Sequence, residues 1–123
     1  MSIPVGLDEL AAQIDVFGTT PYLLTVSDDG RAHAVSVAVV WSDGGLACTV
    51  GKRSAANAAS RSNVSLLWPP HEPDGYSLIV DGDAAGDDGA VTVRPTKAVL
   101  HRSAAAPDPS SACSSDCVPI NLR

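Results

Sequence analysis

Aromatic side chains are scarce in this chain, since Phe, Trp and Tyr make up only 4% of its 123 residues. A core with so few rings has to be packed by aliphatic residues, and 45% of the chain is hydrophobic. That content is enough to bury a core and excludes an intrinsically disordered protein. The length suits one domain, and dimerisation is an expected way for so short a chain to bury more surface.

Positive charge is also in short supply, with 8 Lys and Arg against 14 Asp and Glu, a net charge of −6 and an isoelectric point near 4.7. This excludes a broad basic surface for nucleic acid or an anionic membrane. No apolar run approaches the roughly 20 residues that span a bilayer. The stretch "MSIPVGLDELAAQ" at the start lacks the pattern of a signal peptide, so we expect a cytoplasmic protein.

Cysteine and histidine are few and poorly spaced for metal binding. The three cysteines are Cys48, Cys113 and Cys117. The last two form a Cys-x3-Cys pair without a second pair or a nearby histidine, which is not the usual zinc arrangement. We expect a structural or incidental role for them and no metal site.

Short apolar stretches separated by turns predict a mostly β fold. Apolar residues at helical spacing predict a helix over 7–17, ended by Gly18. We expect six antiparallel strands, at 22–26, 32–41, 46–50, 63–68, 76–86 and 90–101, the last interrupted at Pro95. A short alanine-rich helix is expected between the third and fourth strands. The prediction is a six-stranded antiparallel barrel in one domain, residues 1–102, followed by an irregular arm, residues 103–123.

The second predicted strand has two different faces. One face is bulky and suits a barrel core, whereas the other is small and slightly polar. The bulky face carries His33, Val35, Val37 and Val39, and the small face Ala34, Ser36, Ala38 and Val40. Simple sheet packing and close approach by a subunit or a flat ligand both fit this pattern.

One window of this acidic chain contains no acid. No Asp or Glu occurs from Gly44 to His71, although Lys52, Arg53 and Arg61 lie there. The helix is expected to start near Ser54, and helix N-termini attract anions because their first N–H groups are unpaired. This pattern fits a phosphate-binding turn, and it also fits a solvated basic turn.

No catalytic side chain stands out. His33, His71 and His101 are dispersed, and no "GxSxG" motif occurs. Asp81 and Asp83 share one strand face, but next to a turn they indicate a solvated strand end. Any chemistry is therefore expected to come from a cofactor.

The order of these motifs resembles a known family. The segments "PYLLTVSDDGRAHAVSVAVVW", "GGLACTVGKRSAANAASRSNVSLLW" and "GYSLIVDGDA" follow the order of the pyridoxamine 5′-phosphate oxidase-like split β-barrel, FMN-binding type. More narrowly, residues 7–102 resemble the small flavin or deazaflavin oxidoreductases of actinobacteria. The resemblance implies a homodimer with the cofactor at the subunit interface.

The resemblance also implies the site residues. The phosphate would be held by Thr49, Lys52, Arg53 and Ser54, with Asn57 in the helix. The ring would lie along Val35, Ser36, Val37 and Cys48, and the partner subunit would contribute residues near Trp68 and Pro69.

The chain departs from the family pattern in places that bear on function. Ser54 stands where the family often has a lysine, and the strand at 32–41 has no Arg or Lys. The C-terminal phosphate motif of true pyridoxamine phosphate oxidases is not evident, so vitamin B6 oxidation is not expected. We expect an oxidoreductase that uses FMN or a deazaflavin to transfer hydride to a small substrate. The alternatives are a carrier of flavin, haem or another anionic ligand without turnover, and a barrel without any cofactor.

Overall fold

The computed structural model describes residues 1–87 and 89–103. Within them the chain forms eight strands and two α-helices, with a 3-10 turn, Leu7–Glu9, before the first helix. The helices are α1 (Leu10–Phe17) and α2 (Lys52–Ser60). The strands are β1 (Ser2–Val5), β2 (Tyr22–Val26), β3 (Ala32–Ser36), β4 (Val39–Ser42), β5 (Gly45–Thr49), β6 (Asn63–Trp68), β7 (Ser77–Asp87) and β8 (Ala90–His101).

The prediction of a mostly antiparallel sheet with two short helices is confirmed, but the expected number of six strands was wrong. The predicted arm lies outside the described residues beyond residue 103, so the domain boundary stays a prediction. No helix in the described part of the chain is long and apolar enough to span a membrane.

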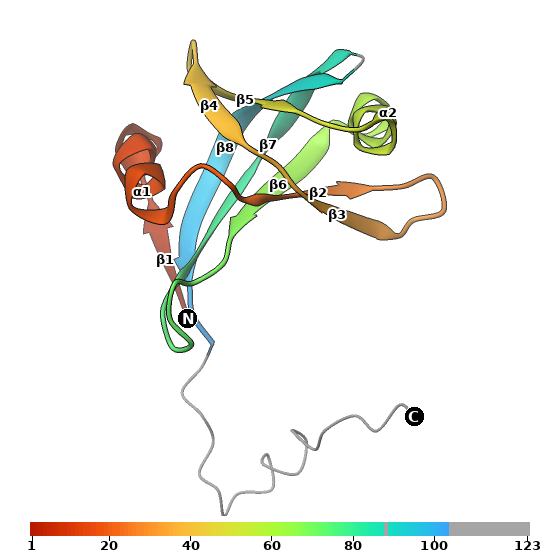
Figure 1. Ribbon diagram of the computed structural model, residues 1–123. Helices are drawn as coiled ribbons and strands as arrows, with labels where there is room; N and C mark the ends of the chain where they lie inside the picture. Colours follow the sequence, from red (N-terminus) through yellow and green to blue (C-terminus); the bar gives the residue numbers. More distant parts are fainter. Residues whose placement is uncertain (88, 104–123) are drawn as a thin grey trace, which may run out of the picture.

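The strands form one curved sheet in the order β3-β2-β6-β7-β8-β5-β4 (Figure 1). The long strand β8 pairs with β7 along one edge. Its other edge pairs with β5 at residues 90–93 and with β1 at residues 98–101. Figure 1 shows α1 beside β1 at one end of the sheet and α2 at the other, near the β2–β3 hairpin.

Pro95 does not interrupt β8, contrary to the sequence-based expectation. It falls between the stretches that pair with β5 and β1, so its missing N–H leaves no ladder bond unmade there. The register with β7 shifts at this point, since Asp81 pairs with Lys97 and Gly82 with Pro95. A Cβ on Gly82 would lie 2.5 Å from the Arg94 carbonyl oxygen, so the close approach requires glycine.

The predicted second strand is in fact two strands, because the chain changes partners within it. β3 pairs with β2, whereas β4 pairs with β5 at the far end of the sheet order. Between them the Val37 N–H donates to the Pro21 carbonyl and the Val39 N–H to the Thr19 carbonyl, at 3.0 and 2.8 Å. These bonds close the barrel, which alternation of side chains along 32–41 could not reveal.

The core is aliphatic apart from one ring. Trp68 is 1% exposed, and its indole N–H donates to the Gly18 carbonyl at 2.7 Å. Gly18 ends α1 with φ 103°, a conformation that favours glycine. The Trp68 indole therefore joins the end of α1 to β6.

The outer face of the sheet carries a continuous apolar row across five strands. Register pairs join its members in turn from one strand to the next, on the side away from the core. We call this the outer row: Tyr22, Leu67, Ile79, Val99 and Pro4. Tyr22 is 43% exposed, and the row has no covering element within the described residues.

Candidate functional site

The beginning of α2 brings together the residues that the sequence singled out for anion binding. β5 ends at Thr49, and α2 begins at Lys52 after the N-cap Gly51. The Val50 N–H donates to the Gly89 carbonyl at 2.9 Å, which attaches this turn to the β7–β8 connection. The helix thus begins two residues before Ser54, because extended Gly51 takes the N-cap position.

The N-terminus of α2 carries two cations and no acid of its own. No acidic residue lies in its first turn, and no side chain caps it. Its first N–H groups lack partners within the helix, as in any α-helix. Lys52 and Arg53 are exposed, and neither makes an ion pair with the residues whose side chains the structure describes, 1–86 and 89–103.

The third cation of the acid-free window has a different role. The Arg61 guanidinium donates from Nε to the Val26 carbonyl at 2.8 Å and pairs with the Asp28 carboxylate at 2.6 Å. It fixes the C-terminal end of α2 to the β2–β3 hairpin. Only Lys52 and Arg53 are therefore available to a ligand among the three.

The β2–β3 hairpin also carries Asp29, whose carboxyl group is held in its negatively charged form. The Ser27 hydroxyl and the Arg31 backbone N–H donate to Asp29, and they lower the pKa of its carboxyl, with a weaker contribution from the Arg53 charge. Asp29 thus stays negative across the physiological range and competes weakly with an incoming anion for Arg53.

The expected phosphate ligands divide into exposed and buried groups. Thr49 is exposed at the end of β5, whereas Ser54 is 2% and Asn57 5% exposed. The Asn57 side-chain N–H donates to the Thr25 hydroxyl at 3.0 Å inside the protein. Asn57 thus connects α2 to β2, a role that its sequence position alone did not indicate.

Replacing Asn57 with alanine should lower the free energy of unfolding by about 1–3 kcal/mol, because the buried Thr25 hydroxyl loses its partner. Urea denaturation monitored by circular dichroism measures this change. The matched control is Asn63→Ala, at an exposed position of β6, which should change stability by less than about 0.5 kcal/mol. Equal effects in the two variants would contradict the structural role of Asn57.

The residues expected along the ring mostly face the core. Val37 and Cys48 are each 6% exposed, and Val35 packs against the core from β3. Burial raises the pKa of the Cys48 thiol, so it stays protonated at neutral pH and is a poor nucleophile. Ser36 alone of the four is exposed.

The Trp68 side chain is also buried, so a ligand cannot reach it. Its ring is fully buried and its only polar atom is already bonded to Gly18. The structure therefore assigns this side chain to the core and leaves Pro69, which is exposed, as the accessible residue at the end of β6.

The dispersed histidines and the aspartate pair form no catalytic group. His71 is hydrogen bonded to the Phe17 carbonyl at 3.1 Å, and His101 to the Ser2 hydroxyl at 3.3 Å. The Ser65 hydroxyl donates to Asp81 at 2.6 Å. Within the described residues, no three His, Cys, Asp or Glu side chains are grouped closely enough to hold a metal ion.

Two mycobacterial proteins are similar to the chain along nearly its whole length. Protein Mb0449c of Mycobacterium bovis and protein MT0457 of Mycobacterium tuberculosis, both described as uncharacterized, are each 43% identical over 137 residues. The match covers 96% of this chain and 96% of each relative. The chain belongs to the family of these mycobacterial proteins. No protein-family model matches it.

Several solved structures share the fold of this chain. A Listeria innocua protein named for pyridoxamine 5′-phosphate oxidase has a TM-score of 0.63 at 16% identity, covering 79% of this chain and 98% of that protein. An FAD-binding protein from Mycobacterium smegmatis has a TM-score of 0.57 at 18% identity, and the match covers 83% of this chain and 100% of that protein. An F420 reductase has a TM-score of 0.55 at 17% identity, and the match covers 65% of this chain and 88% of that protein. The fold is the split β-barrel of pyridoxamine 5′-phosphate oxidase-like proteins, as the sequence predicts.

The same fold occurs in a protein named for a different ligand. A haem-binding protein from Mycobacterium smegmatis has a TM-score of 0.62 at 15% identity, and the match covers 86% of this chain and 58% of that protein. The fold by itself therefore does not select one ligand, and the side chains at the site have to be considered.

Proposed function

We propose that this protein binds FMN or a deazaflavin through its phosphate at the N-terminus of α2. The observation that carries the proposal is the pair Lys52 and Arg53, which are exposed and form no ion pair with the side chains that the structure describes, at a helix start with no acid in its first turn. An anion there gains both charge-assisted hydrogen bonds and the helix dipole. Proteins of the same fold named for FAD and F420 support this choice of ligand.

The residues at this corner have the chemistry that a phosphate needs. Lys52 and Arg53 are exposed cations in the first turn of α2, and Thr49 is exposed at the end of the preceding strand. Gly51 has no side chain that would cover the first N–H groups of the helix. When bound, the flavin or deazaflavin ring supplies the hydride-transfer chemistry. The chain's own part is to hold and orient the cofactor for an oxidoreductase acting on a small molecule.

Titration with FMN and with riboflavin tests this directly, because the two ligands differ by the phosphate. We expect FMN to bind at least tenfold more tightly than riboflavin, since about 1.5–3 kcal/mol is lost with a charge-assisted hydrogen bond and 1.4 kcal/mol is a factor of ten. A deazaflavin with and without its phosphate provides the same comparison. Equal affinity for the two members of each pair would move the site away from α2.

We also propose that the protein is a homodimer, with the outer row as part of the interface. The row places Tyr22, Leu67, Ile79 and Val99 side by side on the sheet face away from the core. Tyr22 is exposed and the other three are half-buried, and a contiguous apolar surface that solvent reaches is typical of an interaction site. A dimer would also exclude water from a flavin or deazaflavin ring bound at the subunit interface. Exclusion of water helps hydride transfer.

Replacing Leu67 with aspartate should convert the dimer to a monomer, because two unpaired carboxylates would be buried at the interface. Size-exclusion chromatography with light scattering gives the mass. Val40→Asp is the control, because Val40 is 67% exposed on β4 and lies outside the outer row. A dimer that survives Leu67→Asp would place the interface elsewhere.

The second candidate function is a carrier that holds a flavin, haem or another anionic ligand without turnover. The lack of a catalytic cluster in the described residues and the similar haem-binding protein favour it. Reduction separates the two functions. A bound flavin that stays bound yet accepts hydride from neither reduced nicotinamide nor a reduced deazaflavin would support the carrier and contradict the oxidoreductase.

A further inference from the structure

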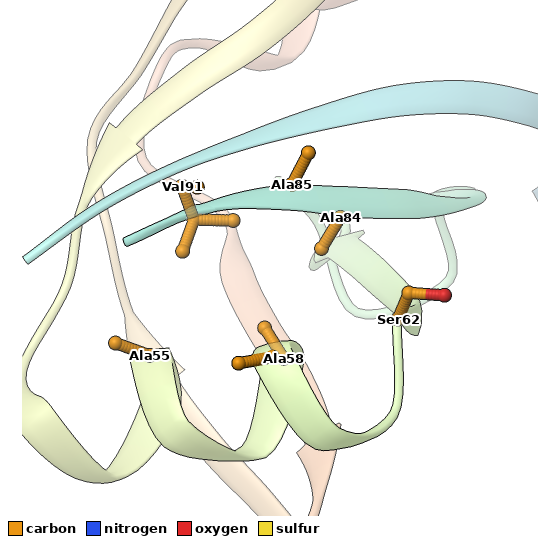
Figure 2. Close-up of a pocket in the computed structure, with 8 residues that line it drawn as sticks. Ala55, Ala58, Ser62, Ala84, Ala85 and Val91 are labelled. Atoms are coloured by element: carbon orange, nitrogen blue, oxygen red, sulfur yellow. The ribbon is translucent and has the colours of Figure 1, made fainter. Parts of the chain in front are cut away.

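A hollow lies between α2 and the sheet, apart from the cations at the start of the helix. Its volume is about 220 Å³. Small residues from both sides line it: Ala55, Ala58, Ala59, Ser62, Ala84, Ala85, Gly86 and Val91. Figure 2 shows α2 below the β7 strand, with Ala58 turned toward Ala84.

The hollow has a buried floor and an open rim. Ala58, Ala84 and Val91 are 4%, 9% and 3% exposed and form the floor. Ala59 is exposed and lies at the rim, so a molecule can enter from solvent, whereas Figure 2 shows the Ala85 side chain pointing away from α2. Protein interiors are normally close-packed, and larger side chains at these alanines would fill the space. Stability alone therefore does not explain why alanines occupy these positions.

The lining selects an uncharged ligand. Among the described residues that line the hollow, none carries a charge, and the Ser62 hydroxyl is the one polar side chain. A charged group there would lose its hydration without gaining a partner. Lys52 and Arg53 are not part of the lining.

The volume selects a small ligand. Pockets for drug-sized molecules measure about 300–1,000 Å³, and an apolar cavity of about 150 Å³ is known to bind benzene. About 220 Å³ suits a single substituted aromatic ring and is too small for a whole flavin. We propose that this hollow is a second binding site, for a neutral apolar molecule about the size of toluene. This inference does not depend on the cofactor proposal.

Titration of the full-length protein with toluene tests the site, with alanine methyl groups labelled with ¹³C as the probe. We expect saturable chemical-shift changes at the methyl groups of the alanines that face the hollow, Ala55, Ala58, Ala59 and Ala84. Benzoate, which adds a charge to a similar ring, should cause no saturable change. No saturable change with toluene up to its solubility limit would overturn the proposal, as would equal binding of benzoate.

Two substitutions on α2 provide a matched pair. Ala59→Leu places a larger side chain at the rim of the hollow and should weaken toluene binding at least tenfold. Ala56→Leu makes the same change at an exposed position of α2 that does not line it, and should change binding less than twofold. Ala55→Leu repeats the test one turn earlier on α2 in case Ala59→Leu does not fold. Equal affinity in the lining and control variants would place any toluene binding elsewhere and overturn the assignment.

Discussion

Removing both free cations at the start of α2 should nearly abolish FMN or deazaflavin binding while the barrel stays folded. Lys52→Ala and Arg53→Ala should each weaken binding by about 1.5–3 kcal/mol, or about 10- to 150-fold, because each removes a charge-assisted hydrogen bond to the phosphate. The double variant should lose more than either single one. Isothermal titration calorimetry or fluorescence quenching of the flavin gives these affinities.

The control for this experiment has to reproduce the change in net charge. Arg94 and Lys97 are exposed cations on β8, remote from α2 in the sequence and absent from the turn that starts the helix. Their double substitution by alanine changes the net charge equally and should leave affinity within about twofold, because neither side chain belongs to the turn or to the helix that would bind the phosphate. Unchanged affinity in both single variants at Lys52 and Arg53 would contradict the proposed phosphate site.

The largest expected loss of stability lies at Trp68. Its ring is the bulkiest side chain in the core and is 1% exposed, so Trp68→Ala should cost about 3–5 kcal/mol of unfolding free energy. That is a large share of the about 5–15 kcal/mol by which small domains are stable, and the variant is expected to fold poorly. Trp68→Phe keeps most of the apolar volume and should cost about 1–3 kcal/mol, because the Gly18 carbonyl loses its donor.

The chain's other tryptophan is a matched control. The Trp41 indole N–H is buried without a hydrogen-bond partner in the described structure, in contrast to that of Trp68. Trp41→Phe therefore removes an unsatisfied donor and should be close to neutral in stability. Urea unfolding of the two phenylalanine variants measures the difference. A Trp68→Phe variant as stable as Trp41→Phe would show that the bond to Gly18 contributes nothing.

Burial separates the predicted site residues that a ligand can reach from those that pack inside the protein. Thr49, Lys52 and Arg53 stand next to one another in sequence, so a strand followed by a helix is enough to bring them together. Asn57 and Trp68 have partners 32 and 50 residues away, at Thr25 and Gly18. A contact at such separation leaves no periodic signal in the sequence.

The strands show the same division between local and long-range information. Residues 22–26 and 63–68 match β2 and β6 as predicted, because alternating apolar residues between turn signals specify each strand locally. The stretch at 32–41 forms two strands instead of one. The Val37 and Val39 N–H groups donate to backbone carbonyls just before β2. β1 was not predicted, since four residues that include a proline form a strand only because the free edge of β8 is available to them.

The sequence by itself determined that this is a β-rich antiparallel protein, and that its positive charge is concentrated where β5 is followed by a helix. Both follow from local patterns, namely the alternation of side chains and the absence of acids from Gly44 to His71. The split-barrel type was implied by the resemblance of these motifs to a known family. Only the tertiary structure decided that Arg61 is paired, that Val37, Cys48 and Trp68 face the core, and that small residues of α2 and β7 enclose a hollow. These outcomes depend on which segments pack together, and packing is settled by the whole chain at once.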